Sequence, residues 1–278
     1  MSADLHIHST YSDGSFPPEQ LVKMAKENGL STIALADHDT VEGVPEMIAL
    51  GKEMGIEVIP AIEFSTVREK AEVHILGYYM DYISRDFLKR VEAFFTARLD
   101  RAREMVNRLN QLGINIHYED VTKLAGDKYI GRPHLAMALK QAGYIKETDD
   151  AYTNELIGNG GKAYVPKFQL KPVEAISIIK EAGGIAVLAH PYFINRGKPF
   201  GEEEIRELTE YGLDGLEVYH SKHSEKTSQY YLEIAEKLNL LVTGGSDFHG
   251  ENTPGIQVGD VRIDDQRVKK LKDYLGIS

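Results

Sequence analysis

The chain has 278 residues, of which 42% are hydrophobic and 27% charged, and its formal net charge is −11. This length can bury one sizeable core, and the acidic balance argues against a general affinity for polyanions. Cysteine is absent, which excludes disulfides, thiolate metal ligands and a cysteine nucleophile.

No apolar run approaches the ~20 residues that span a bilayer. The N-terminus also lacks a basic region followed by an apolar stretch, which is the pattern of a secretory signal. We therefore expect a cytoplasmic protein that does not interact with membranes, and we predict no stable protein partner.

Short apolar runs alternate along the chain with amphipathic stretches. The runs are rich in β-branched residues or Leu and are bounded by Gly, Asp, Asn or Pro, which is typical of strands. The predicted strands are 4–8, 32–36, 57–62, 73–78, 185–189, 215–219 and 240–243. The predicted helices between them are 17–28, 44–54, 172–182, 202–211, 225–238 and 266–274. Repeated strand–helix units predict a parallel sheet, and seven strands fit a distorted (β/α)7 barrel of the TIM type better than an open sheet.

The alternation breaks between residues 85 and 165. A long amphipathic helix is predicted over 86–112, followed by shorter helices at 118–124, 133–142 and 152–157. We interpret 85–165 as a helical insertion into a discontinuous barrel formed by 1–84 and 166–278. Four arginines lie along the long helix at 98, 101, 103 and 108, but Asp100 and Glu104 are interleaved with them. This pattern favours a solvated face with local ion pairs over a nucleic-acid groove.

Histidine and acidic residues gather where the predicted strands end. His6 and His8 alternate at the end of the first strand, so both imidazoles can face one centre. The other members of the set follow or lie within later strands: Asp13, His38, Glu63, His74, His190, Asp247 and His249. In a barrel this face carries the active site. Burying so many ionisable groups is costly without metal ions to neutralise them, so we predict a metal centre of imidazoles and carboxylates.

The motifs also resemble those of a known family. Asp4-Leu5-His6-Ile7-His8-Ser9, Asp37-His38-Asp39, Ala189-His190-Pro191 and Gly245-Ser246-Asp247-Phe248-His249 are similar to motifs of the polymerase and histidinol phosphatase (PHP) superfamily. Gly131-Arg132-Pro133-His134 in a helical insert resembles the branch of 3′,5′-nucleoside bisphosphate phosphatases and 5′→3′ exoribonucleases.

This resemblance implies a site for three divalent ions. One ion would be held by His6, His8, Glu63 and Asp247, and a second by Asp13, His38 and His249. Glu63 would bridge to a third ion, held by His74 and His190. Mn²⁺ is the favoured metal, with Zn²⁺, Fe²⁺ or Mg²⁺ as alternatives.

The resemblance also implies a phosphoesterase mechanism. A hydroxide bridging the metals, held by Asp13, Glu63 and His249, would attack phosphorus in line. Arg132 and His134 would bind a second phosphate, although Pro133 also fits an ordinary helix start. His223 would bind substrate or protonate the leaving group; His220 could serve instead, or be a polar surface residue. Asp37 and Asp39 are expected to orient His38 or cap the next helix rather than bind metal.

The implied substrates are a small nucleotide, such as adenosine 3′,5′-bisphosphate losing its 3′-phosphate, or the 5′ end of a short RNA. A histidinol-phosphate phosphatase is an alternative of the same class. An amidohydrolase-like C–N hydrolase is another, but the fourth strand offers His74 where such sites usually have a carboxylated Lys. A non-catalytic metal-binding module is the third.

Overall fold

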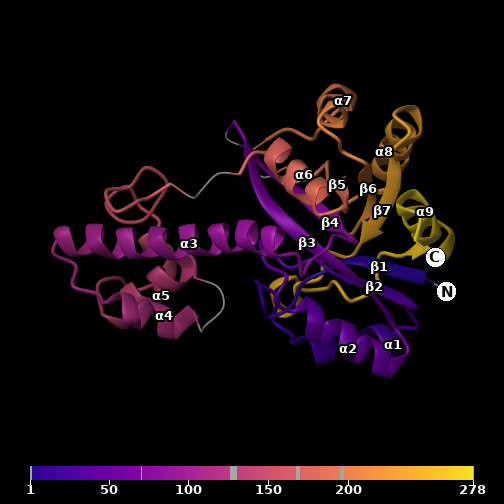
Figure 1. Ribbon diagram of the computed structural model, residues 1–278. Helices are drawn as coiled ribbons and strands as arrows, with labels where there is room; N and C mark the ends of the chain where they lie inside the picture. The colour runs from indigo at the N-terminus through magenta and orange to yellow at the C-terminus, as the bar shows by residue number, and fades with distance from the viewer. Residues whose placement is uncertain (1, 70, 126–129, 167–169, 195–196, 278) are drawn as a thin grey trace. The chain divides into compact units, whose positions relative to one another are not determined.

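A computed structural model describes residues 2–69, 71–125, 130–166, 170–194 and 197–277, except the side chains of Phe95 and Arg98. The chain divides into two compact units (Figure 1): unit 1 contains Met1–Arg90 and Gln169–Ser278, and unit 2 contains Val91–Phe168. In the described part of the chain, no helix is both long enough and apolar enough to cross a membrane.

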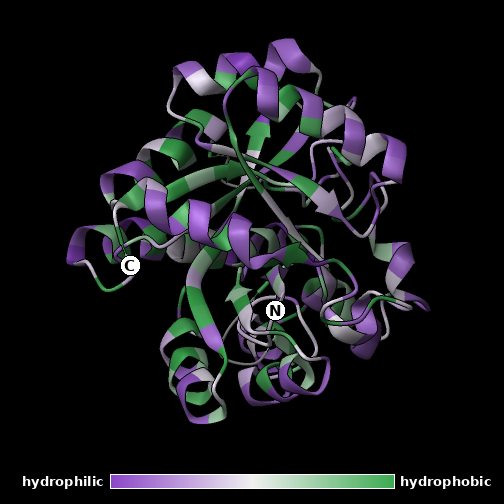
Figure 2. Cartoon of the chain, turned by 90° about the vertical axis from the view of Figure 1, so that its right-hand side faces the viewer, coloured by the Kyte–Doolittle hydropathy of each residue, from purple (hydrophilic) through white to green (hydrophobic). Residues whose placement is uncertain are grey.

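Unit 1 is an α/β unit around an eight-stranded mixed sheet with the order β7-β6-β5-β4-β3-β2-β1-β8. The strands are β1 (Ser2–Ile7), β2 (Thr32–Leu35), β3 (Glu57–Arg68), β4 (Ala71–Tyr78), β5 (Ile185–Leu188), β6 (Gly215–His220), β7 (Leu241–Gly245) and β8 (Ile263–Asp264). The helices are α1 (Pro18–Glu27), α2 (Val44–Met54), α6 (Pro172–Glu181), α7 (Glu202–Glu210), α8 (Glu225–Lys237) and α9 (Asp265–Leu275), with a 3₁₀ turn η2 (Gly250–Asn252). In Figure 2 the strands are mostly hydrophobic (green), whereas the helices carry both hydrophilic (purple) and hydrophobic residues.

The prediction of an all-parallel, seven-stranded sheet is wrong in two respects. Strand β4 runs antiparallel to both β3 and β5, and a short eighth strand pairs antiparallel with β1. Strand β3 extends to Arg68, six residues beyond its predicted end, and only two residues separate it from β4. So short a connection cannot make the crossover that a parallel pair requires.

The sheet closes almost completely into a barrel where β1 meets the end of β7. The Asp247 N–H donates to the His6 carbonyl (2.8 Å), and the His8 N–H donates to the Phe248 carbonyl (2.9 Å). Gly245 makes this approach possible, because a Cβ there would lie 2.4 Å from His6 N. The closure brings together the segments that carry the first and last of the predicted ligands.

The inside of the barrel is filled by alternate residues of the strands. Small side chains occupy many of these positions, and α9 adds two apolar ones. The cluster includes Ala3, Leu5, Ala34, Ala36, Ile59, Ala61, Leu76, Tyr78, Ile185, Val187, Ala189, Val268 and Leu271. On β2, β3 and β4 the same two-residue repeat continues from this apolar layer to His38, Glu63 and His74.

Unit 2 is a helical unit with its own core. Its helices are α3 (Arg85–Gln111), which begins in unit 1, α4 (Tyr118–Ala125), α5 (Arg132–Gln141) and the 3₁₀ turn η1 (Thr148–Ala151). Met105, Leu109, Val121 and Leu139 are among the buried residues of this core. The predicted helix at 152–157 is wrong: this segment consists of turns and bends.

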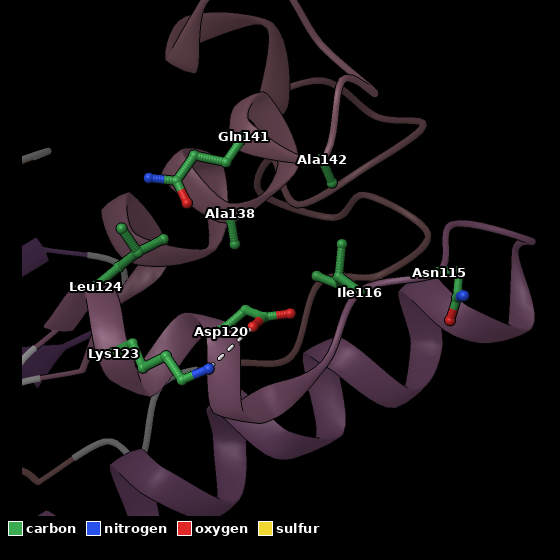
Figure 3. Close-up of a pocket in the computed structure, with 8 residues that line it drawn as sticks. All are labelled: Asn115, Ile116, Asp120, Lys123, Leu124, Ala138, Gln141 and Ala142. Carbon is green, nitrogen blue, oxygen red and sulfur yellow. Dashed lines mark ion pairs between the residues drawn. The ribbon is translucent and has the colours of Figure 1, made fainter.

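A pocket of ≈ 330 Å³ lies on unit 2, between α4 and α5 (Figure 3). Lys123 pairs with Asp120 beside it at 3.7 Å, and none of the predicted site residues lines it. Two ion pairs on α3 form as predicted, Arg103 with Asp100 (3.1 Å) and Arg108 with Glu104 (2.9 Å). Arg101 instead donates to the Val165 carbonyl at 2.7 Å. The side chain of Arg98 lies outside the described residues.

Two buried carboxylates anchor the segments that follow β1 and β7. Asp37 accepts hydrogen bonds from the N–H of Ser9 (2.7 Å), the hydroxyl of Ser9 (2.6 Å) and the hydroxyl of Ser12 (2.5 Å). Asp4 accepts from the N–H and hydroxyl of Ser246 and from the N–H of Gly259. Asp37 therefore fixes the loop that carries Asp13, a different role from the predicted orientation of His38, and Asp4 fixes the residue next to Asp247.

We expect Asp37→Ala to lower the free energy of unfolding by about 3 kcal/mol, because three donors lose a buried charged acceptor. Urea unfolding in the presence of a chelator measures this without any contribution from metal. Asp81→Ala, at an exposed position, is the matched control and should change stability by less than about 0.5 kcal/mol. Equal stability of the two variants would show that the anchor contributes nothing.

Candidate metal centre

One buried carboxylate, Glu63, lies at the centre of the predicted site. It sits inside β3 rather than just past it, and it is fully buried. Its Oε2 faces three imidazoles, at 3.2 Å from His6 Nε2, 3.3 Å from His8 Nε2 and 3.2 Å from His38 Nδ1. Its Oε1 faces two more, at 2.9 Å from His74 Nδ1 and 3.1 Å from His190 Nε2.

Two further carboxylates extend this cluster on either side. Asp247 Oδ1 lies 3.2 Å from His8 Nε2 and 3.5 Å from His6 Nε2. Asp13 Oδ1 lies 3.2 Å from His249 Nε2, and its Oδ2 lies 3.7 Å from His38 Nε2. All nine residues predicted from the sequence as a metal centre are therefore brought to one place.

Donor atoms within 4.8 Å of one another form three groups. The first is His6, His8, Glu63 and Asp247, the second is His8, Asp13, His38 and His249, and the third is His38, Glu63 and His74. The first set agrees with the predicted grouping. His8 and His38 each face two groups, whereas His190 lies outside the third group but contacts the same Glu63 oxygen as His74.

The geometry of these atoms fits divalent cations. With ligand bonds of about 2.1 Å, neighbouring donor atoms of a tetrahedral or octahedral shell lie about 3.0–3.4 Å apart, close to the distances around Glu63. Several of the facing atoms are buried and have no hydrogen-bond partner among the described residues: His6 Nε2, both ring nitrogens of His8, His38 Nδ1 and Glu63 Oε2. Buried polar atoms without a hydrogen-bond partner indicate that a ligand binds there.

The electrostatics of the cluster also favour the binding of divalent cations. Burial alone would lower the pKa of His8, but the carboxylates of Asp247 and Glu63 outweigh it and raise that pKa to about 10. The carboxylates of Glu63 and, to a smaller extent, Glu72 overcome burial and raise the pKa of His74 to about 10. Burial prevails at His38 and lowers its pKa to about 4. Glu63 stays ionised, because His38, His6 and His74 overcome burial and hold its pKa well below its usual range.

Sequence reasoning missed Glu217 and misjudged His220, both on β6. Glu217 is fully buried, and its Oε1 accepts a hydrogen bond from His6 Nδ1 at 2.9 Å. His220 is also buried, with Nε2 3.2 Å from Asp247 Oδ2, so the prediction of a polar surface residue is wrong. An acidic residue inside the apolar run 215–219 was the available signal.

The substrate candidates occupy two places. His223, in unit 1, donates from Nδ1 to the Val218 carbonyl at 2.8 Å. Arg132 and His134, in unit 2, lie at the start of α5. Arg132 donates to Asn159 Oδ1 at 2.8 Å and lies over the rings of Tyr152 and Tyr164.

Asp39 lies beside the cluster, where its backbone N–H donates to the Glu63 carbonyl at 3.0 Å. Its Oδ1 accepts a hydrogen bond from the Ser65 N–H at 2.8 Å, so it links the loop after β2 to β3.

Comparison with known proteins places this geometry in a family. The PHP domain family matches residues 4–161. The chain is 34% identical to a 5′-3′ exoribonuclease of Haemophilus influenzae, over 88% of this chain and 89% of that protein. It is 30% identical to a phosphoribosyl 1,2-cyclic phosphate 1,2-diphosphodiesterase of Eggerthella lenta (90% and 95% covered) and 30% identical to a 3′,5′-nucleoside bisphosphate phosphatase of Chromobacterium violaceum (92% and 90%).

A solved structure agrees with the sequence relatives. A putative metal-dependent phosphoesterase from Bifidobacterium adolescentis is 34% identical and superposes with a TM-score of 0.81, covering 99% of this chain and 96% of that one. The predicted barrel fold and the predicted enzyme class are thereby confirmed. The chain belongs to the PHP family and is a metal-dependent phosphoesterase.

Proposed function

We propose that this phosphoesterase hydrolyses phosphate esters of small nucleotides, such as the 3′-phosphate of adenosine 3′,5′-bisphosphate. The observation that carries the proposal is Glu63, buried among five imidazoles. Its Oε2 and the three imidazole nitrogens that face this oxygen have no hydrogen-bond partner among the described residues. Removal of nucleotides from the 5′ end of short RNA is a second candidate, because a relative of that name shares 34% identity nearly throughout both chains. Both substrates are intracellular, so we propose a cytoplasmic location.

We assign the ligands of three ions, with Mn²⁺ as the favoured metal. His6, His8, Glu63 and Asp247 would hold the first, and Asp13, His38 and His249 the second. His74 and His190 would hold the third together with Glu63. When bound, the ions supply Lewis acidity and an activated water at neutral pH. Three dications against three carboxylates leave an excess of about three positive charges, which suits a dianionic phosphate.

The arrangement leaves the protein's own groups with positioning tasks. Asp13 is the most exposed of the three carboxylates, with 41% of its side chain accessible, whereas Glu63 has 1%. We therefore place the attacking water beside Asp13 and His249. The carboxylate of Asp13 would accept a hydrogen bond from this water. Glu63 keeps the neighbouring imidazoles facing inward, and no protein nucleophile is required.

We propose that Arg132 and His134 bind a second phosphate of the substrate. Gly131 N–H donates to His134 Nδ1 at 3.1 Å, so the ring proton is on Nε2, and burial lowers the pKa of His134, which keeps it neutral. A neutral Nε2–H donates to phosphate oxygen, and the planar guanidinium of Arg132 adds charge-assisted hydrogen bonds.

His223 suits hydrogen-bond acceptance from a substrate better than acid catalysis. Because its Nδ1 donates to Val218, its Nε2 carries the lone pair. Burial lowers its pKa, so the imidazolium needed for protonating a leaving group is disfavoured. The other role predicted from the sequence, in which His223 protonates the leaving group, stays a prediction.

A parallel substrate assay tests the proposed function. Enzyme loaded with Mn²⁺ is offered adenosine 3′,5′-bisphosphate, a 5′-phosphorylated oligoribonucleotide, a cyclic ribose 1,2-phosphate and histidinol phosphate. We expect phosphate release from the bisphosphate, with or without nucleotides from the RNA. Turnover of only the cyclic ester or only histidinol phosphate would reject the nucleotide proposal while leaving the enzyme class intact.

Loading with Mn²⁺ should raise the melting temperature of chelator-treated enzyme. A ligand at 100 times its Kd adds about 2.7 kcal/mol to the free energy of unfolding, which corresponds to about 5–10 °C for a chain of this size. Differential scanning fluorimetry with increasing Mn²⁺ measures it. A melting temperature that does not respond to any divalent cation would contradict the assignment of a metal centre.

Asp13→Ala and His190→Ala should each reduce kcat more than about 100-fold while leaving the circular dichroism spectrum unchanged. The physical reason is loss of a ligand from a cluster that acts as one unit. Asp81→Ala serves as the control with an intact cluster. Near-normal kcat of Asp13→Ala with all metal bound would show that the second ion is wrongly assigned.

Arg132→Ala should raise KM for a bisphosphate about ten- to hundredfold and change kcat much less, because it removes charge-assisted contacts to a non-reacting phosphate. Arg103→Ala is the matched control, since Arg103 pairs with Asp100 in the same unit. Steady-state kinetics on the bisphosphate and on a nucleoside monophosphate separate the effects. A similar loss on both substrates would argue against a second-phosphate site.

A further inference from the structure

Glu217 is a buried carboxylate that touches two of the assigned ligands. Its Oε1 accepts from His6 Nδ1 at 2.9 Å, and its Oε2 accepts from the backbone N–H of His190 at 2.7 Å. Its side chain is completely inaccessible. Both oxygens therefore act within the protein, and Glu217 has no atom left to contact substrate.

These two contacts fix different properties of the ligands. A carboxylate beside Nδ1 keeps the ring proton of His6 on that nitrogen, so the lone pair of Nε2 faces Glu63 and Asp247. The second contact holds the backbone of His190, whose φ of 26° is unusual for a residue with a Cβ. This contact holds the backbone in the conformation from which the imidazole of His190 faces Glu63.

His220 acts on Asp247 in the same manner. The backbone N–H of Lys222 donates to His220 Nδ1 at 3.1 Å, which makes Nδ1 an acceptor and places the ring proton on Nε2. His220 Nε2–H therefore donates to Asp247 Oδ2 at 3.2 Å. This leaves Asp247 Oδ1 to face His6 and His8.

A bulge in β6 lets both residues reach the cluster. Residues three apart on a regular strand point to opposite faces. The register of β6 against β7 shifts between Glu217 and Tyr219, so that two steps along β6 correspond to one step along β7. The extra residue brings Glu217 and His220 to the same side, a known use of bulges next to active sites.

We propose that Glu217 and His220 are positioning residues of the metal centre, with Glu217 shared between the ion held by His6 and the ion held by His190. The proposal rests on the ligand assignment of the proposed function. Glu217 fixes the ring proton of His6 and the backbone of His190. His220 fixes the carboxylate of Asp247. The β6 segment thus sets metal affinity without binding metal itself.

Mn²⁺ binding to the Glu217→Gln variant tests this proposal. An amide has one acceptor where the carboxylate has two, so either His6 or His190 loses its partner. We expect about 10- to 100-fold weaker Mn²⁺ affinity by titration calorimetry, fewer bound equivalents at limiting metal, and recovery of most of the kcat at saturating metal. Thr243→Val is the matched control: it is buried on β7 opposite Glu217 and should bind Mn²⁺ like the wild type.

His220→Leu provides a second, independent measurement, because it removes the donor to Asp247 at similar volume. Unchanged Mn²⁺ affinity in folded Glu217→Gln overturns the proposal, and folded His220→Leu decides in the same way if Glu217→Gln does not fold. Equal weakening in Thr243→Val also overturns it, since that would reflect a general loss of packing. Absence of Mn²⁺ binding to the wild type is a different result, which overturns the ligand assignment itself.

Discussion

The structure depends on how a single buried carboxylate is shared. The two carboxylate oxygens of Glu63 face five imidazoles: Oε2 faces three of them and Oε1 faces the other two. An ionised carboxylate at full burial is costly unless positive charge surrounds it. Without metal that charge comes from protonated histidines, and with metal it comes from the ions. The barrel therefore has to hold its imidazoles close together in either state, which explains why so many buried hydrogen bonds support the rim.

That support is organised as a set of carboxylates behind the ligands. Asp4 anchors the segment next to Asp247, Asp37 anchors the loop of Asp13, and Glu217 holds His6 and His190. None of the three contacts solvent appreciably. Outer hydrogen bonds of this kind determine ring orientation and ligand basicity. The chain thus contains two layers of acidic residues, one facing the imidazoles directly and one behind them.

The sequence predicted which residues meet in the cluster better than it predicted how their side chains are oriented. On β2, β3 and β4 the side chains of His38, Glu63 and His74 follow a plain two-residue repeat, which can be read from the sequence. A register shift in β1 turns His6 toward the cluster, and one in β6 does the same for Glu217 and His220. Just after β5, the unusual backbone of His190 has the same effect. Such irregularities arise from pairing across strands far apart in the chain, so local patterns do not encode them. Strand β4 was predicted, but its antiparallel direction was not, because the polar end of β3 has the composition of a loop.

The closing of the barrel at Gly245 also has a consequence for how the enzyme is made. His6 emerges first from the ribosome, whereas its neighbours Asp247 and Glu217 follow more than 200 residues later. Until then β1 has no partner along that seam, and Asp4 has no Ser246 or Gly259 to hold. Contacts so distant in sequence form late in folding. The complete cluster therefore forms only after nearly the whole chain has been synthesised, because Asp247 and His249 are its last members along the sequence.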